Sequence, residues 1–391
     1  MKVSFLDMPK SELVARGGIH TAREISGQPD LWLNIWQRLQ ESYVPIKRFI
    51  DTFAARENCD IILTGAGTSA FIGEVLAGWL RRETGYRVRA VSTTDIVTHP
   101  KHIFFKDKPT LLVSFARSGN SPESVATMDL ANQLCDTIAH LVITCNPDGQ
   151  LIQQLEPGNG ISFLLPPEAN DKSLAMTGSF TAMSLAGMLL LGGKPLERYE
   201  PPFLRFIGYG KDFFARYLPD LHNLADMEFR RAVFLGSGAM HGSAHEAHLK
   251  LQELTDGQVI CKYDSFLGFR HGPKAVIDRE TLNVFLFSNN KYVLQYEYDL
   301  VADINRGEKG CFRLGISETK IDDIELDLNI YFTENHDELP EPLLAILHVL
   351  PAQVMGFYKS LFLGLKPDTP SLSGTITRVV QGVNIYPFKD E

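Results

Sequence analysis

Short apolar runs alternate with amphipathic stretches through the first half of the chain. Runs typical of buried strands lie at 61–63, 87–91, 110–115, 140–144 and 161–165, and helical patterns lie at 70–82 and 122–134. Strands that alternate with helices are typical of a parallel sheet with helices on both faces. We therefore expect a three-layer αβα domain, whose ligands bind beyond the carboxyl ends of its strands.

The second half of the chain repeats this plan at an offset of about 170 residues. Three short features recur in the same order. They are the Gly-x-Gly turn at 65–67 and 236–238, the Thr-Leu pair that starts a strand at 110 and 281, and the Asp-Leu pair in the following helix at 129 and 299. This duplication predicts two tandem doubly wound (flavodoxin-like) α/β domains with parallel sheets. The expected boundaries are a helical segment at 1–50, domains at 51–200 and 215–365, and a tail at 366–391, with the join between 196 and 217, where prolines cluster.

Three segments outside the predicted sheets also have recognisable patterns. Pro29 is expected to open a helix in the N-terminal segment. An apolar helix is expected at 343–363, with a kink near Leu350 because Pro351 lies inside it. In the tail, residues 379–383 have a strand-like pattern.

The composition favours a two-domain cytoplasmic protein that does not bind nucleic acid. A chain of 391 residues is too long for one typical core, which favours two domains. The net charge of -9 argues against a nucleic-acid-binding surface, which needs a basic excess. The five cysteines are scattered without a C-x-x-C pair, so reduced thiols and a cytoplasmic location are expected. No signal peptide is evident, and the longest apolar run, near 188–191, is too short to cross a bilayer.

The stretch 235–273 carries the clearest catalytic chemistry. Glu246, Lys250 and Glu253 fall at i, i+4 and i+7 of a helical pattern, so they share one face. His271 follows about one strand and one turn later. Two carboxylates, one ammonium and one imidazole suit proton transfer on a small polar substrate. The alternative is a solvated helix face, where such an ion pair contributes only about 0.3 kcal/mol.

Hydroxyl side chains follow two neighbouring strands at the points where helices begin. Ser118, Gly119 and Ser121 lie after the strand at 110–115, and Thr68 and Ser69 lie after the strand at 61–63. Hydroxyls and free N–H groups at helix N-termini form an anion site without net positive charge, which suits a phosphate. The alternative is that these residues only cap their helices. Neither loop is a Walker motif, so nucleotide hydrolysis is not expected.

Two further features of the sequence have competing interpretations. His245 and His248 are one helical turn apart, but no H-E-x-x-H motif is present, so they are expected to line a pocket or an interface, and no metal site is predicted. Lys172, at the start of an expected helix, could reach an anionic substrate or could be a surface charge.

Four motifs in this order resemble the sugar isomerase (SIS) family. They are Gly65-Ala66-Gly67-Thr68-Ser69, Arg117-Ser118-Gly119-Asn120-Ser121, Glu246-x-x-x-Lys250-x-x-Glu253 and His271-Gly272-Pro273. The chain is similar over about residues 20–380 to the isomerase half of glucosamine-6-phosphate synthase, which has two such domains. The segments 20–25, 171–177 and 378–383 resemble the subfamily of galactosamine-6-phosphate deaminase/isomerases, often called tagatose-6-phosphate ketose/aldose isomerases.

The resemblance implies a role for each candidate residue. Glu253 would move a proton between C1 and C2 of the sugar, and His271, from the neighbouring subunit, would open the ring. Glu246 and Lys250 would orient the hydroxyls or the amine. The residues implied to hold the sugar phosphate are Thr68, Ser69, Ser118, Gly119 and Ser121, with Gly67, Arg117 and Lys172 as further substrate contacts.

Two departures from the synthase pattern narrow the implied chemistry. Ala116 stands where the synthase has a serine, so one phosphate hydroxyl is missing. The segment 370–375 has no counterpart of the synthase's tail lysine, which argues against a Schiff base.

The resemblance implies a cytoplasmic enzyme that converts D-galactosamine 6-phosphate to D-tagatose 6-phosphate and ammonia without a cofactor. Its partners would be the phosphosugar and a second copy of the chain, as a homodimer with shared active sites, and neither nucleic acid nor membrane. Glucosamine 6-phosphate as the substrate and simple aldose/ketose isomerisation of a neutral phosphosugar remain open. A sugar-phosphate-sensing module without catalysis is a third alternative, although a sensor would be expected to lose the helix carboxylates.

Overall fold

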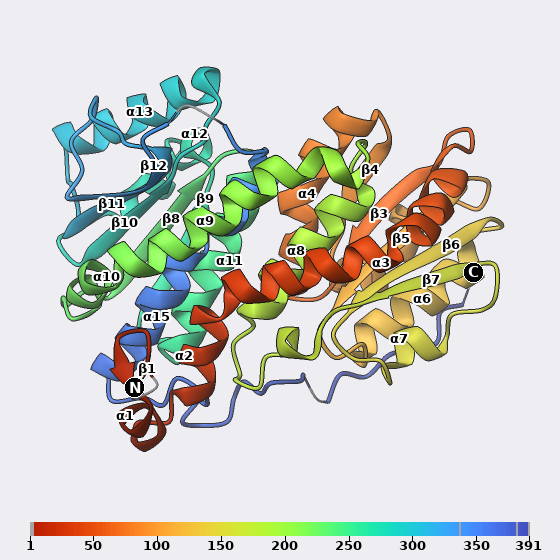
Figure 1. Cartoon of the computed structure of the whole chain (residues 1–391), viewed down its shortest axis with the longest axis horizontal. Helices are drawn as coiled ribbons and strands as arrows, with labels where there is room; N and C mark the ends of the chain where they lie inside the picture. Colours follow the sequence, from red (N-terminus) through yellow and green to blue (C-terminus); the bar gives the residue numbers. More distant parts are fainter. Residues whose placement is uncertain (1–3, 336–337, 381, 390–391) are drawn as a thin grey trace. The chain divides into compact units, whose positions relative to one another are not determined.

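The computed structural model describes residues 4–335, 338–380 and 382–389, which form two compact units (Figure 1). The N unit consists of Asp30–Asn170, Gly178–Tyr199 and the tail from Ile376. The C unit consists of the chain up to Pro29, Asp171–Thr177 and Glu200–Thr375. Each unit contains one five-stranded sheet.

The sheet of the N unit is parallel throughout, in the order β4-β3-β5-β6-β7. Numbered along the chain this order is 2-1-3-4-5, the flavodoxin-like arrangement expected from the sequence. Every residue of the central strands β3 and β5 is buried, which explains their unbroken apolar runs. The strands are β3 (Asp60–Thr64), β4 (Arg87–Ala90), β5 (Thr110–Ala116), β6 (Ile138–Thr144) and β7 (Gly160–Leu164).

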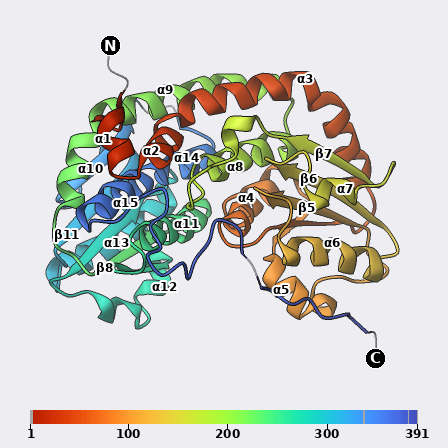
Figure 2. The same ribbon diagram turned by 90° about the horizontal axis from the view of Figure 1, so that it is seen from below.

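Helices cover both faces of this sheet. Helix α4 packs against α8, and α5 packs against α6, which makes the three layers (Figure 2). The helices are α3 (Gln28–Ala54), α4 (Thr68–Thr84), α5 (Thr93–Thr98), α6 (Pro122–Leu134), α7 (Gln150–Gln153) and α8 (Gly178–Leu191), with 3₁₀ turns at Pro100–His102, Pro167–Ala169 and Leu196–Tyr199. Pro29 lies in the first turn of α3, as predicted, and Pro45 lies inside the same helix.

The C unit repeats the same sheet order, β9-β8-β10-β11-β12, again with parallel strands. The duplication predicted from the sequence is therefore confirmed at the level of topology. The strands are β8 (Arg231–Gly236), β9 (Ile260–Asp264), β10 (Thr281–Leu286), β11 (Phe312–Thr319) and β12 (Leu328–Thr333), and a short antiparallel pair is formed by β1 (Ser4–Phe5) and β2 (Met8–Pro9). The helices are α1 (Lys10–Ala15), α2 (Ile19–Ser26), α9 (Glu200–Arg216), α10 (Leu218–Ala225), α11 (Ala239–Leu254), α12 (Phe266–Phe269), α13 (Lys291–Arg306), α14 (Glu341–His348) and α15 (Leu350–Phe362), with a 3₁₀ turn at Pro273–Val276.

The apolar helix expected at 343–363 is interrupted near the expected kink. Helix α14 ends at His348 and α15 begins at Leu350, with Pro351 in its first turn. By length and by its mean hydropathy of 1.2, Glu341–Phe362 could cross a membrane, but the apolar window is 100% buried inside the protein. Complete burial of this kind is also what the core helix of a globular domain shows.

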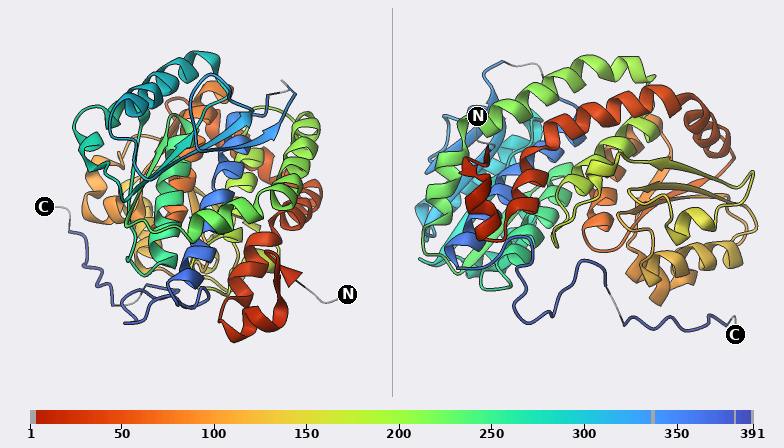
Figure 3. Two further views of the ribbon diagram at one scale, coloured as in Figure 1. Left: turned by 90° about the vertical axis from the view of Figure 1, so that its left-hand side faces the viewer. Right: turned by 60° about the horizontal axis from the view of Figure 1, so that its bottom comes forward.

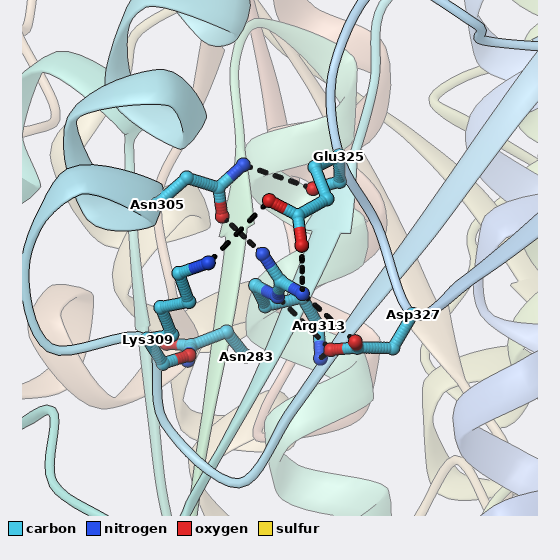
Figure 4. A network of polar contacts seen from close by, with 6 residues as sticks. All are labelled: Asn283, Asn305, Lys309, Arg313, Glu325 and Asp327. Atoms are coloured by element: carbon cyan, nitrogen blue, oxygen red, sulfur yellow. Dashed lines mark hydrogen bonds and ion pairs between the residues drawn. The ribbon is translucent and has the colours of Figure 1, made fainter.

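Buried Arg313 joins the loop between β11 and β12 to the sheet of the C unit (Figure 4). Its Nε donates to Asp327 Oδ2 at 2.9 Å and its Nη2 to Asp327 Oδ1 at 2.8 Å, a bidentate pair. Its Nη1 donates to Asn305 Oδ1 at 2.5 Å. Hydrogen bonds to Arg313 hold the pKa of Asp327 below its usual value. This network therefore fixes the edge of the second sheet.

Residues 376–380 and 382–389, the described end of the tail, form an extended segment without a ladder partner (Figure 3). The strand predicted at 379–383 is wrong for residues 379, 380, 382 and 383, and Gln381 lies outside the described residues. An alternating pattern by itself does not make a strand, because a strand also needs a neighbouring backbone for its hydrogen bonds.

Candidate active site

Helix α11 brings Glu246, Lys250 and Glu253 together, as their spacing predicted. The Lys250 ammonium lies 3.5 Å from Glu246 Oε1 and 2.6 Å from Glu253 Oε2. The side chains of Glu246 and Lys250 are 0% exposed, and that of Glu253 is 24% exposed. The alternative of a solvated helix face is therefore wrong, because two charges of the three are withdrawn from water.

The burial of Glu246 and Lys250 strengthens the constraint that the three charges place on one another. An ammonium between two carboxylates holds both of them in place, since an isolated charge is costly in a low-dielectric interior. Glu253 is at the open end of the triad, where a substrate proton can reach it. A carboxylate fixed by one hydrogen bond to a buried lysine suits a general base with a defined direction.

His271 lies beyond α12, in a turn that ends at Gly272. Its backbone N–H donates to Gly268 O at 3.0 Å, and Gly272 has a φ of 113°, which favours glycine. The residue is exposed, and within the described part of the chain its ring makes no hydrogen bond or ion pair. The structure therefore places this imidazole on an open turn, with its ring available to a ligand.

Three histidines of α11 surround Tyr263 of β9. The His245 ring stacks on Tyr263 with centroids 3.8 Å apart, and His241 and His248 approach the same ring at 5.3 and 4.9 Å. Burial lowers the pKa of His248 to about 4, so this ring is neutral at neutral pH. Among the described residues, no three His, Cys, Asp or Glu side chains are grouped to hold a metal ion.

The hydroxyl loops of the N unit leave their helix N-termini without side-chain caps. Gly67 is the N-cap of α4, so Thr68 and Ser69 are its first residues, and the capping role considered for them is wrong. Ser121 is the N-cap of α6, but its Oγ donates to Ser124 Oγ at 2.6 Å and does not cap the backbone. Two uncapped helix N-termini with adjacent hydroxyls have the chemistry that binds an anion.

The loop at Ser118 is held by contacts to the segment after β6. Gly119 has a φ of 67°, and Asn146 Nδ2 donates to Ser118 O at 2.8 Å. The Ser118 Oγ accepts from the N–H of Asn120 at 3.3 Å, and Asn120 Oδ1 accepts from Gln150 N at 2.9 Å. These contacts fix the loop backbone before any ligand arrives, which lowers the entropy lost on binding.

Arg117 and Lys172 have surroundings that their sequence positions did not reveal. Arg117 is buried and donates through Nη2 to the backbone carbonyl of Arg378, so it anchors the tail. The helix expected at Lys172 is wrong, because 171–177 is irregular and α8 begins at Gly178. The Lys172 side chain is exposed, and its backbone N–H donates to Glu24 Oε1 at 2.6 Å.

Comparison with known proteins identifies the family. Residues 55–192 match the SIS domain family. Over 384 residues the chain is 38% identical to the D-galactosamine-6-phosphate deaminase AgaS of Escherichia coli O157:H7, an alignment that covers 96% of this chain and 97% of the relative. The chain belongs to the SIS family.

Solved SIS structures share the whole fold. The tagatose-6-phosphate ketose/aldose isomerase of Escherichia coli aligns with a TM-score of 0.86 at 35% identity, covering 95% of this chain and 98% of that chain. A Clostridium novyi NT protein, provisionally assigned as the same isomerase, aligns with a TM-score of 0.95 at 38% identity and covers 99% of this chain and 100% of that chain. These two solved structures therefore share both SIS domains with this chain.

Glu24 of this SIS protein was missed as a candidate residue. Its Oε2 accepts from Ser173 Oγ, and its Oε1 accepts from the N–H of Lys172. Burial and the nearby charge of Asp171 raise the pKa of Glu24 to about 7. The available signal was the pair of segments 20–25 and 171–177, which resemble the subfamily and prove to be in contact.

A cavity of about 490 Å³ opens at the carboxyl ends of β10 and β11 in the second SIS domain. Its lining includes Ser288, Asn289, Tyr298, Ser317 and Glu318. None of the residues proposed for catalysis or phosphate binding lines it. The cavity is thus separate from the acid–base triad, and the chemistry of α11, not the volume of this pocket, identifies the candidate active site.

Proposed function

We propose that this SIS protein is a deaminating isomerase that converts D-galactosamine 6-phosphate to D-tagatose 6-phosphate and ammonia. The observation that carries the proposal is the buried ammonium of Lys250 between Glu246 and Glu253. The deaminase named above, at 38% identity over nearly the full length, supports the same substrate. A complete acid–base triad, with Glu246 and Lys250 buried, also argues against a sensor without catalysis.

The proposed reaction begins with binding and ring opening. The hydroxyls and backbone N–H groups at Thr68, Ser69 and the loop 118–121 hold the phosphate, with Gly67, Arg117 and Lys172 as further proposed contacts. His271 donates a proton to the ring oxygen as the bond between that oxygen and C1 breaks, which leaves an open-chain aldehyde. We further propose that His271 is supplied by the second subunit of a cytoplasmic homodimer.

Proton transfer and hydrolysis complete the reaction. Glu253 removes the C2 proton and returns it to C1, while one proton of the amine passes to the carbonyl oxygen. The amino aldehyde thereby becomes a C2 imine with a C1 hydroxymethyl group. Water adds to C2 and ammonia leaves, so that a ketone remains. Lys250 and Glu246 orient the substrate hydroxyls and amine. Positioned proton transfer of this kind contributes about two to four orders of magnitude in rate.

The test is ammonia release from purified protein supplied with the 6-phosphates of galactosamine, glucosamine and tagatose in turn. Galactosamine 6-phosphate should yield ammonia and tagatose 6-phosphate in equal amounts. Turnover of glucosamine 6-phosphate alone would reassign the epimer, and no ammonia from either amino sugar would refute deamination.

Two variants assign the roles of the residues in the same assay. Glu253→Gln keeps the shape of the side chain and should lower kcat at least about a hundred-fold. Ser118→Ala should mainly raise KM, because it removes one contact to the phosphate, and an unchanged KM would exclude Ser118 from the phosphate site.

A further inference from the structure

The two SIS domains contain the same turn in the same conformation. Gly67, the N-cap of α4, has φ 54° and ψ −130°, and Gly238, the N-cap of α11, has φ 58° and ψ −127°. Neither helix has a side-chain cap at this position. Both turns therefore place the positive end of a helix dipole beside the glycine, which is an environment that favours an anion.

The space above these two glycines is occupied differently. A Cβ atom built on Gly67 would meet no other atom within 4 Å, whereas one built on Gly238 would lie 2.8 Å from Glu341 Oε1. Glu341 is the first residue of α14, so its carboxylate lies at the N-termini of two helices. A protein carboxylate thus fills in the second domain a space that is open in the first.

The other anion-binding elements of the second domain are also satisfied internally. The N–H of Ser288, which follows β10, donates to Glu297 Oε2 at 2.9 Å. Asn290 caps α13, because its Oδ1 accepts from Tyr292 N at 2.9 Å and Val293 N at 3.4 Å. The corresponding N-cap of α6, Ser121, makes no such bond. In the second domain the N–H groups of Ser288, Tyr292 and Val293 are therefore already bound to side chains of the chain itself.

We propose that Glu341 is an internal substitute for a phosphate, which closes the glycine turn of the second domain to a sugar phosphate and fixes the N-terminus of α11. The inference rests on the proposed function only in taking the first domain as the site of the substrate phosphate. Each chain then binds one phosphosugar. Glu341 acts as a positioning residue, since α11 carries Glu246, Lys250 and Glu253 and starts beside this carboxylate.

The experiment is titration of the full-length protein with inorganic phosphate, combined with thermal unfolding. The wild-type chain should bind one phosphate, and Ser118→Ala should weaken that site. Glu341→Ala should unfold at a lower temperature and bind a second phosphate, which restores its unfolding temperature in a saturable manner that chloride at equal ionic strength does not reproduce. Glu308→Ala, which removes an exposed glutamate, should retain one site and its stability.

The outcomes distinguish a failure of the role proposed for Glu341 from a failure of the phosphate site proposed in the first domain. Phosphate binding that is lost in Ser118→Ala without a second site in Glu341→Ala would overturn the role of Glu341 alone. Absence of binding to the wild-type chain would instead refute the phosphate site of the proposed function.

Conservative substitutions of Glu341 decide the question if the alanine variant does not fold. Glu341→Gln should lower kcat about ten-fold or more with little change in KM, because α11 loses its anion while the phosphate site is untouched. Glu341→Asp should recover part of this loss. Wild-type stability and kcat in Glu341→Gln would overturn the proposal.

Discussion

At the scale of single residues, the central feature is a lysine that is fully buried between two glutamates. Lys250 and Glu246 are 0% exposed, so water cannot stabilise either charge if its partner is removed. In that setting the removal of one partner costs far more than the loss of a surface ion pair. The triad is consequently part of the core of the second domain as well as the proposed catalytic apparatus.

We predict that Lys250→Met lowers the free energy of unfolding by about 3–5 kcal/mol, because Glu246 loses the ammonium 3.5 Å away. Adding Glu246→Gln should recover a large part of this loss, since the uncompensated charge is then absent. Urea unfolding of the wild-type chain, both single variants and the double variant measures the coupling. Lys10→Met, which removes an exposed charge, is the control. Strictly additive effects would show that the two charges are not coupled.

At the scale of elements, helix α2 is hydrogen-bonded to the irregular segment 171–177 through Glu24, a carboxyl group whose pKa is raised. Hydrogen bonds from Ser173 and from the N–H of Lys172 favour the charged form of Glu24, but burial and Asp171 outweigh them, and the pKa rises to about 7. A carboxyl whose pKa is raised in the folded state stabilises the fold at low pH and loses that contribution as pH rises. The attachment of α2 is therefore expected to weaken toward neutral pH.

We predict that Glu24→Gln reduces the dependence of unfolding free energy on pH. The wild-type chain should lose stability between about pH 4.5 and 7 as Glu24 ionises in the folded state, and the variant should lose less. Glu297, whose pKa burial also raises to about 7, leaves a residual slope in the variant. Urea unfolding at a series of pH values from 4.5 to 8 measures the difference. An unchanged slope would mean that Glu24 does not titrate in this range.

At the scale of the whole molecule, the two copies of one fold differ at corresponding positions. The first SIS domain has uncapped helix N-termini and an open glycine turn, which suit a phosphate. The second domain carries the acid–base triad and fills its own glycine turn with Glu341. We propose that binding and chemistry are divided between these two copies of one fold.

A mixing experiment tests whether the proposed active site is shared between subunits. Glu253→Gln and His271→Ala should each be nearly inactive alone. Random exchange of subunits between the two variants should restore about one quarter of wild-type activity, because half of the dimers are mixed and each has one complete site. Each variant taken through the same exchange by itself is the control. No recovery after demonstrated exchange would place both residues of a site in one subunit.

The sequence by itself determined the alternation of strands and helices in the first domain, its duplication, and the shared helix face of Glu246, Lys250 and Glu253. Local periodicity is sufficient for this, since a run such as 110–115 is apolar because its strand is buried, and the spacing of Glu246, Lys250 and Glu253 places them on one helix face in any context. The glycine turns at 65–67 and 236–238 were also visible, because a positive φ restricts the choice of residue.

Only the tertiary structure decided which charged side chains are buried, which glycine turn is occupied by a carboxylate, and which segments pair as strands. The spacing on α11 is equally compatible with a solvated face, and burial of Lys250 depends on elements distant in sequence that pack over it. The two glycine turns are alike in sequence, and they differ because α14 brings Glu341 to one of them from about a hundred residues away. The described residues of the tail have a strand-like pattern but form no strand, because the pairing of a strand is a property of its neighbours in space.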